Sequence, residues 1–301
     1  MNNGKITSTQ LYTWLIVAMS APLAVAASGS GWLANLLAGV VCTLICVCVL
    51  GIVRSKALPK WFLAVESLWL IPVLIALTSK TGNMWPDAGS GKLIPVVLLV
   101  LGAWSASGDL RRGIGAGVTL IWIIAVMYGF VCTAAVKDIQ VKWLIPPNMD
   151  FDLELMFIYL LPLVVILLPC ERKNAWGIWL IPSLGVLFSV LTSGVLSAGL
   201  ASELENPFYE MSKSLSLFGV ARRFEALVAS VVTLGWFGLI SMILHAISNL
   251  GKGAVWGAAI AAGVAILCEL TIATDILAVG SVLFWVILPV ATQGIGKIKK
   301  I

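Results

Sequence analysis

Apolar runs separated by short polar stretches make up almost the whole chain between Leu11 and Ile295. Most of the runs are about 18 to 25 residues long, which is the length that a helix needs to cross the hydrocarbon core of a bilayer. Inside that core each unpaired peptide group costs several kcal/mol, so a span must be a helix or a strand of a closed barrel. Barrel strands are alternating segments of about ten residues, unlike these runs. The pattern therefore predicts an all-α integral membrane protein.

We expect about ten transmembrane helices, with ends that shift by a few residues, and a count of nine or eleven fits the same pattern. The predicted spans are residues 11–28, 32–53, 61–78, 93–107, 113–134, 151–169, 175–200, 224–249, 253–270 and 274–294. Hydrophobic residues form 60% and charged residues 11% of the 301 positions. The mean hydropathy of +1.04 is far above that of a chain with a water-facing surface.

Charge predicts the orientation of the spans, because lysine and arginine are retained on the cytoplasmic side. With the N-terminus inside, 12 of the 19 basic residues fall on the inner side. Among the loop carboxylates, only Asp109 and Glu171 fall there. We therefore expect both termini in the cytoplasm. The net charge of +5 reflects this orientation, and no basic patch with interleaved aromatic residues supports nucleic-acid binding.

The first apolar run has a second interpretation, as a cleaved signal peptide, because Lys5 precedes it and Ala24-Val25-Ala26 resembles a cleavage site. Against this, Thr7 and Gln10 form a capping-box pattern that predicts a helix starting at Ser8. Charge does not distinguish the two interpretations, because both place residue 30 on the outer side of the membrane.

Ten spans are compatible with two inverted repeats of five, residues 8–136 and 150–296, within one domain covering 1–301. The first helix of each such repeat is commonly broken at mid-membrane, and prolines stand near the middle of spans 1 and 6. A proline removes one helical hydrogen bond and releases backbone groups to a ligand. Prolines also kink membrane helices that bind nothing. The candidate ligand-binding residues are Met19, Ser20, Ala21, Pro22, Tyr159, Leu161 and Pro162.

The loop between spans 7 and 8 contains an amphipathic segment. Apolar residues recur at helical spacing after Asn206-Pro207, while polar residues form the opposite face. The apolar face comprises Phe208, Met211, Leu215 and Phe218, and the polar face comprises Glu210, Lys213 and Ser214. We interpret it as a surface-lying helix over the outer vestibule that ends at Gly219. A solvated linker with chance periodicity is the alternative.

Several short motifs are similar to those of one known family. They are Ile6-Thr7-Ser8-Thr9-Gln10-Leu11, Phe151-x-x-Glu154 with Leu161-Pro162, Asn206-Pro207-Phe208, Arg223-Phe224-Glu225-Ala226-Leu227, and the basic end Lys297-Ile298-Lys299-Lys300. The chain thereby resembles the B subunits of endospore germinant receptors, which are spore germination permeases of the amino acid/polyamine/organocation superfamily. The resemblance is spread over the whole chain. It implies a LeuT-like 5+5 inverted-repeat permease fold, an outer vestibule near Pro207, Phe208, Arg223 and Glu225, and no cofactor.

The resemblance also implies a function and a setting. The chain would be a germinant-sensing subunit that binds an amino acid-like small molecule. It would work with two other receptor subunits, an A-type subunit and a C-type lipoprotein, in the bilayer of the spore inner membrane. The chain departs from the family in being shorter and in carrying Met19-Ser20-Ala21-Pro22 where members usually have a Gly-x-Gly unwinding point. Glycine lets a ligand carboxylate approach bare amides, and Ser20 and Ala21 are small without being equivalent.

Ionisable residues at membrane depth are functional candidates, because burying one costs at least about 2.5 kcal/mol. Glu66 lies deep in span 3 and is a candidate proton, ion or water-path residue, although a hydrogen bond to a neighbouring helix would also satisfy it. Glu154, at the start of span 6, is a second candidate that an interfacial position would equally explain. His245, the single histidine, lies toward the inner end of span 8, where packing is the simpler role.

Other chemical patterns fail on inspection. Cys46 and Cys48 point to different faces of span 2, so no metal site is expected there. Gly89-Ser90-Gly91-Lys92 lacks both the first glycine and the final Ser or Thr of a phosphate loop. Without a nucleophile elbow or a histidine pair, we do not expect an enzyme.

Two functional alternatives remain beside the germinant sensor. One is a proton- or cation-coupled transporter of amino acids or other small solutes, and the other is a ligand-free membrane scaffold subunit.

Overall fold

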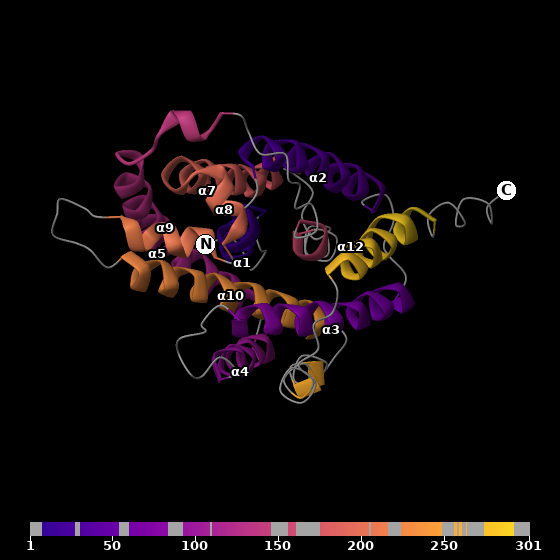
Figure 1. The fold of residues 1–301 in the computed structure, drawn as a ribbon. Helices are drawn as coiled ribbons and strands as arrows, with labels where there is room; N and C mark the ends of the chain where they lie inside the picture. Colours follow the sequence, from indigo (N-terminus) through magenta and orange to yellow (C-terminus); the bar gives the residue numbers. More distant parts are fainter. Residues whose placement is uncertain are drawn as a thin grey trace.

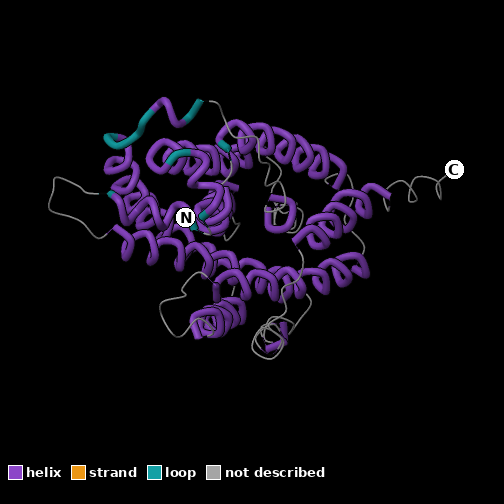
Figure 2. The backbone as a smooth tube through the Cα atoms, viewed as in Figure 1, coloured by secondary structure: helices purple, strands orange, loops and turns teal. Residues whose placement is uncertain are grey.

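Helices make up nearly all of the described chain in the computed structural model (Figures 1 and 2). The structure describes residues 8–27, 31–53, 60–83, 93–108, 110–145, 156–160, 175–204, 206–215, 224–248, 256–257, 259–260, 263 and 274–291. No strand occurs among these residues. The prediction of an all-α protein is therefore confirmed for the part of the chain that the structure describes.

The α-helices are α1 (Ser8–Pro22), α2 (Trp32–Val53), α3 (Lys60–Asn83), α4 (Leu93–Ser107), α5 (Leu110–Val136), α7 (Leu180–Leu196), α8 (Ala198–Glu203), α9 (Pro207–Ser214), α10 (Phe224–Ser248) and α12 (Thr274–Val282). Three π-helical elements are η1 (Leu23–Ala27), η4 (Met156–Leu160) and η7 (Leu283–Ile287). Two 3-10 elements are η3 (Val141–Trp143) and η6 (Ala175–Trp179).

Four helices of the described chain are long and apolar enough to cross a membrane, within Trp32–Gly51, Gly117–Val136, Gly177–Leu196 and Glu225–Ser248. Four shorter apolar helices accompany them, within Thr9–Val25, Leu68–Thr78, Leu93–Ser107 and Ile276–Ala291. Six of the eight fall inside a predicted span, whereas Thr9–Val25 starts two residues before its predicted span and Gly117–Val136 ends two residues after its own. Exposed side chains on α4 and α5, including Trp104 and Trp122, are large and apolar, as expected where a helix faces lipid instead of water.

The predicted boundaries agree closely with several helices. The bounds of α2 and α4 coincide with predicted spans 32–53 and 93–107. The start of α1 at Ser8 is the start that the capping-box pattern predicts. Of span 6, the structure describes only 156–160, and most of 253–270 lies outside the described residues.

One predicted span is wrong at its outer end. Residues 175–200 do not form one helix, because α7 stops at Leu196 and a separate helix, α8, begins at Ala198. Between them Ser197 adopts φ 76° and ψ 149°, a backbone region that costs a non-glycine residue about 1 to 3 kcal/mol. Its N–H donates to the Ser193 carbonyl at 3.1 Å, and its Oγ accepts from the Leu200 N–H at 3.5 Å. Serine thus closes one helix and caps the next, which a hydropathy window does not detect.

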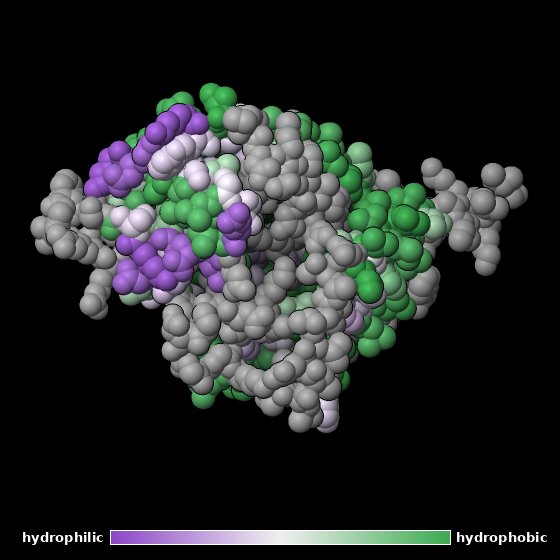
Figure 3. Space-filling model, viewed as in Figure 1, coloured by the Kyte–Doolittle hydropathy of each residue, from purple (hydrophilic) through white to green (hydrophobic). Residues whose placement is uncertain are grey.

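Long-range hydrogen bonds bring several helix ends to one end of the bundle. The Trp32 indole N–H donates to the Leu144 carbonyl at 3.1 Å, and the Gln140 N–H donates to the Gly194 carbonyl at 2.8 Å. The start of α2 and the ends of α5 and α7 therefore lie together. Hydrophilic side chains gather over the end of α5, η3 and α9, at the upper left of Figure 3, whereas α12 at the right is hydrophobic. This end is the one that the charge pattern predicts to be outside.

Cysteine-accessibility labelling tests the predicted orientation. In a cysteine-free background, single cysteines at positions 56 and 172 should react only with a reagent in the cytoplasm. Cysteines at positions 87, 142 and 205 should react only from the opposite side, because lysine and arginine are retained inside. Labelling of positions 56 and 205 from the same face would refute the ten-span arrangement.

Candidate functional site

α1 is buried on nearly every side. Between Leu11 and Ala24, only Thr13 and Ile16 are partly exposed. The segment carries no charged residue, so every face of the helix can be packed against a neighbour. Its neighbours are α10, α5 and α7, which makes α1 the centre around which the candidate site is built.

α10 approaches α1 closely through two glycines. A Cβ added to Gly235 would lie 2.7 Å from the Ala21 Cβ and 2.8 Å from the Ser20 Oγ. A Cβ on Gly238 would lie 3.1 Å from a Val17 methyl carbon. Small residues at such a crossing let two helix backbones touch, a common basis of helix association in membranes. The faces of Ser20 and Ala21 that point toward α10 are therefore filled by packing.

The helix changes type directly after Pro22, where α1 ends and the π-helical η1 begins. Proline has no N–H, so the Ala18 carbonyl lacks its usual partner four residues on. Two residues further along, the Ser20 carbonyl accepts a hydrogen bond from the Tyr128 hydroxyl at 3.5 Å. The Ser20 Oγ donates to the Val17 carbonyl at 2.7 Å. The chain thus remains helical through residue 27. It accommodates the proline in the wider turn of a π-helix.

The segment after Asn206 forms an amphipathic helix as its pattern predicts, but the predicted end at Gly219 is wrong, because α9 ends at Ser214 and Leu215 is extended. In α9, Pro207, Phe208 and Met211 are buried, whereas Glu210 and Lys213 on the other face form an ion pair at 2.7 Å. Leu215, directly after the helix, is also buried. α9 packs on α10 and α7. It therefore covers the end of the bundle beside η1 and does not behave as a solvated linker.

An aromatic cluster of Tyr128, Phe188 and Phe208 lies between α1 and α9. The ring centroids are 4.9 Å apart for Tyr128 and Phe188, 4.9 Å for Phe188 and Phe208, and 5.9 Å for Tyr128 and Phe208. All three rings are buried. Only Phe208 was singled out from the sequence. Tyr128 had a detectable signal, because a tyrosine inside an apolar span needs a partner for its hydroxyl, whereas Phe188 had none.

The second half of the chain presents a similar arrangement in the part that is described. Tyr159 is buried in η4, which packs on α12 and α2. Trp285 in η7 is also fully buried, and its indole Nε1 has no hydrogen-bond partner among the described residues. Each π-helical element stands within two residues of a proline, namely Pro22, Pro162 and Pro289. Such π turns occur frequently at functional sites.

The C-terminal end of α10 makes hydrogen bonds through the side chains of Ser241 and His245. The His245 Nδ1–H donates to the Ser241 carbonyl at 2.9 Å, and its ring meets the Trp14 ring edge-on at 5.4 Å. The Ser241 hydroxyl donates to the Ser105 Oγ of α4 at 2.9 Å. His245 is therefore buried in packing between α1 and α10.

Buried charge is absent from the described core, in which no Asp, Glu, Lys or Arg is buried. Glu225 lies partly exposed in the first turn of α10. Glu66 is on α3, three residues before Trp69, whose ring stacks on Phe284 at 4.6 Å. Among the described residues around α1, the groups that could bind a charged ligand are therefore backbone groups and hydroxyls. The Glu66 side chain, Glu154, Leu161, Pro162, Arg223, Phe218 and Gly219 lie outside the described residues.

Candidate metal ligands do not gather in the described part of the chain, where no group of three His, Cys, Asp or Glu side chains occurs. Cys42 and Cys46 are buried one turn apart on α2. The expectation of a metal-free protein stays a prediction.

Comparison with known proteins adds no family assignment. No protein-family model matches the chain, and no curated protein sequence matches it. The resemblance to spore germination permeases therefore rests on the short sequence motifs alone.

Proposed function

We propose that this chain is a permease-like membrane subunit that senses a small, amino acid-like germinant in a spore germination receptor. The observation that carries the proposal is the change of helix type after Pro22, within a helix that is buried on nearly every side. At this point a side chain reaches the backbone of the helix, because the Tyr128 hydroxyl donates to the Ser20 carbonyl. Such a point suits the binding of a polar molecule at mid-membrane.

The packing of the helices supports an inverted repeat of five elements. In such a fold α1 to α5 correspond to η4, α7, α10, residues 253–270 and α12 in order. Several contacts then occur in matched pairs, although the close contact of α1 with α10 has no equally well-packed counterpart between η4 and α3 in the described residues. α1 packs on α5 as η4 packs on α12, and α1 packs on α7 as η4 packs on α2. α5 packs on α10 as α12 packs on α3. Corresponding helices of the two halves also contact each other directly, namely α2 with α7 and α3 with α10.

The same correspondence relates the two candidate ligand-binding segments. Pro22 near the end of α1 and Pro162 after η4 occupy the first element of each half, and each adjoins a π-helical element. Met19, Ser20, Ala21 and Tyr159 are buried beside them. We propose that the germinant binds between these segments below the aromatic cluster, and that binding is transmitted to A-type and C-type partner subunits in the spore inner membrane.

The substitution Pro22→Ala tests the proposed site. Alanine supplies the missing N–H to the Ala18 carbonyl and favours a regular α-helix by about 3 kcal/mol. We expect the variant to be produced at the wild-type level, while the germinant concentration for half-maximal response rises at least about tenfold, a difference of roughly 1.4 kcal/mol. The measurement is a germination dose-response curve with immunoblots of the spore membrane.

Pro72→Ala is the matched control, because Pro72 stands inside the regular helix α3 with no π-helical element beside it. This variant should retain the wild-type dose response. A wild-type response from Pro22→Ala, or an equal loss from both variants, would contradict the proposed site.

A further inference from the structure

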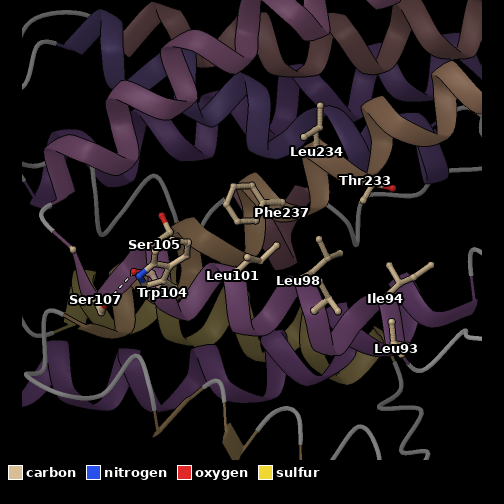
Figure 4. A pocket seen from close by; sticks show the side chains of 12 residues that line it. Leu93, Ile94, Leu98, Leu101, Trp104, Ser105, Ser107, Thr233, Leu234 and Phe237 are labelled. Atoms are coloured by element: carbon tan, nitrogen blue, oxygen red, sulfur yellow. Dashed lines mark hydrogen bonds between the residues drawn. The ribbon is translucent and has the colours of Figure 1, made fainter.

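A long groove runs between α4 and α10, with a volume of about 970 Å³ (Figure 4). One wall is formed by α4 from Leu93 to Ser107 and by Gly108 directly after it, and the other is one turn of α10 around Leu234. The lining residues are Leu93, Ile94, Val97, Leu98, Leu101, Trp104, Ser105, Ser107, Gly108, Thr233, Leu234 and Phe237. None of them is charged, so the groove suits an apolar occupant.

The rim of the groove continues into a surface of the kind that lipid covers. Val97 is 44% exposed and Trp104 is 77% exposed, and Val100, outside the lining, is 62% exposed on the same helix. α4 has 15 residues, or about 22 Å at 1.5 Å per residue. That is shorter than a hydrocarbon core of about 30 Å, and local thinning of the bilayer is one of the ways in which such a mismatch is met.

Basic residues follow the polar end of the groove in the sequence. Ser105, Ser107 and Gly108 line this end, and α5 starts directly after it with Leu110 and then Arg111 and Arg112. Asp109 leaves the stretch 109–112 with a net charge of +1. Basic residues at the end of an apolar groove between membrane helices are suited to an anionic lipid headgroup. An exposed tryptophan such as Trp104 is typical of headgroup depth.

We propose that the groove between α4 and α10 binds an acyl chain of an anionic membrane phospholipid, with its headgroup beside the start of α5. The acyl chain lies against Val97, Leu101 and Leu234, and the phosphate lies at the end marked by Ser107 and Gly108. The lipid would stabilise α4 against α10, the helix that also packs on α1 through Gly235. This site is separate from the proposed germinant site and does not depend on it.

Two tryptophan substitutions on α4 test the apolar part of the site. The full chain is purified from vesicles of equal parts phosphatidylglycerol and phosphatidylcholine, and retained lipid is counted by native mass spectrometry. Val97→Trp fills the groove and should lower retained phosphatidylglycerol at least about fivefold. Val100→Trp makes the same change one turn away, outside the lining, and should retain lipid as the wild type does. Equal retention by the two variants would overturn the proposal.

Two arginine substitutions test the headgroup. The double variant Arg111→Gln/Arg112→Gln should lose at least about tenfold of the preference for phosphatidylglycerol over phosphatidylcholine, because each basic residue near the surface attracts anionic lipid. Lys142→Gln, at the opposite end of the bundle, should keep that preference. An unchanged preference in the double variant would overturn the headgroup assignment.

Disulfide formation tests whether protein fills the groove instead of lipid. A disulfide between Val97→Cys and a cysteine in 253–270, or between two chains that carry Val97→Cys, would show that protein fills it and would also overturn the proposal.

Discussion

The substitution Gly235→Leu should prevent the chain from folding into a stable bundle. Even a Cβ at this position would lie 3.0 Å from the Ala21 backbone nitrogen, besides its contacts with the Ala21 Cβ and the Ser20 Oγ. Backbone atoms of a buried helix cannot move aside as a flexible side chain can, so α10 and α1 would have to separate. We expect a loss of at least about 3 kcal/mol, the upper part of the range for overpacked cores. Gly235→Ala should lose less.

The measurement is the thermal unfolding of purified protein in detergent, together with its monodisperse fraction in gel filtration. Gly129→Leu is the matched control, because Gly129 lies on the exposed face of α5 with nothing within 4 Å of an added Cβ. Leucine is a better helix former than glycine by about 1 kcal/mol, so this variant should be as stable as the wild type or slightly more stable. If Gly235→Leu unfolds like Gly129→Leu, the close contact of α1 and α10 does not exist in the protein.

The substitution Glu66→Gln should abolish most of the germination response without preventing membrane insertion. Glutamine keeps the volume and much of the hydrogen bonding of glutamate, but it can neither ionise nor carry a proton. Glu66→Leu removes the polar group and should favour insertion. If the carboxyl group handles a proton, an ion or a water path, both variants should lose at least about tenfold in activity, or roughly 1.4 kcal/mol.

The alternative role for Glu66 is a structural hydrogen bond to a neighbouring helix. In that case the glutamine variant would behave like the wild type, and the leucine variant would differ mainly in assembly. Activity of Glu66→Gln within about twofold of wild type, a difference of about 0.4 kcal/mol, would refute the proposed role. Glu203→Gln makes the same chemical change at an exposed position of α8 and should leave the response unchanged. A large loss of response in Glu203→Gln would mean that the assay does not distinguish a carboxyl group inside the membrane from one at the surface.

The candidate site was only partly predictable, because its residues act through partners far away in the chain. Ser20 and Pro22 were predicted as ligand-binding residues because they are a small residue and a proline inside an apolar run. Their actual surroundings depend on Gly235, more than 200 positions later, and on Tyr128. No periodicity in a single sequence reports which helix lies against which. Phe188 looks the same in the sequence whether it faces lipid or the aromatic cluster.

Local chemistry was sufficient for the helices themselves. The hydropathy pattern predicted α2 and α4 with their observed bounds, because the need to bury peptide groups in hydrocarbon acts on each run separately. The alternation of apolar and charged residues predicted which face of α9 is buried, since that face depends only on helical spacing. The division of predicted span 7 at Ser197 was not predicted, because a capping serine and an internal serine have the same hydropathy.

The sequence by itself therefore determined that the described part of the chain is helical and that several of its runs are long and apolar enough to span a membrane. It also determined where most of those runs begin and end, and which residues are chemically unusual within them. Only the tertiary structure decided that α1 is the buried centre, that Gly235 closes one side of it, and that α4 and α10 leave a groove between them. The physical reason is that the solvation of a helix depends on its own residues, whereas its neighbours depend on the matching of surfaces that are distant in the chain.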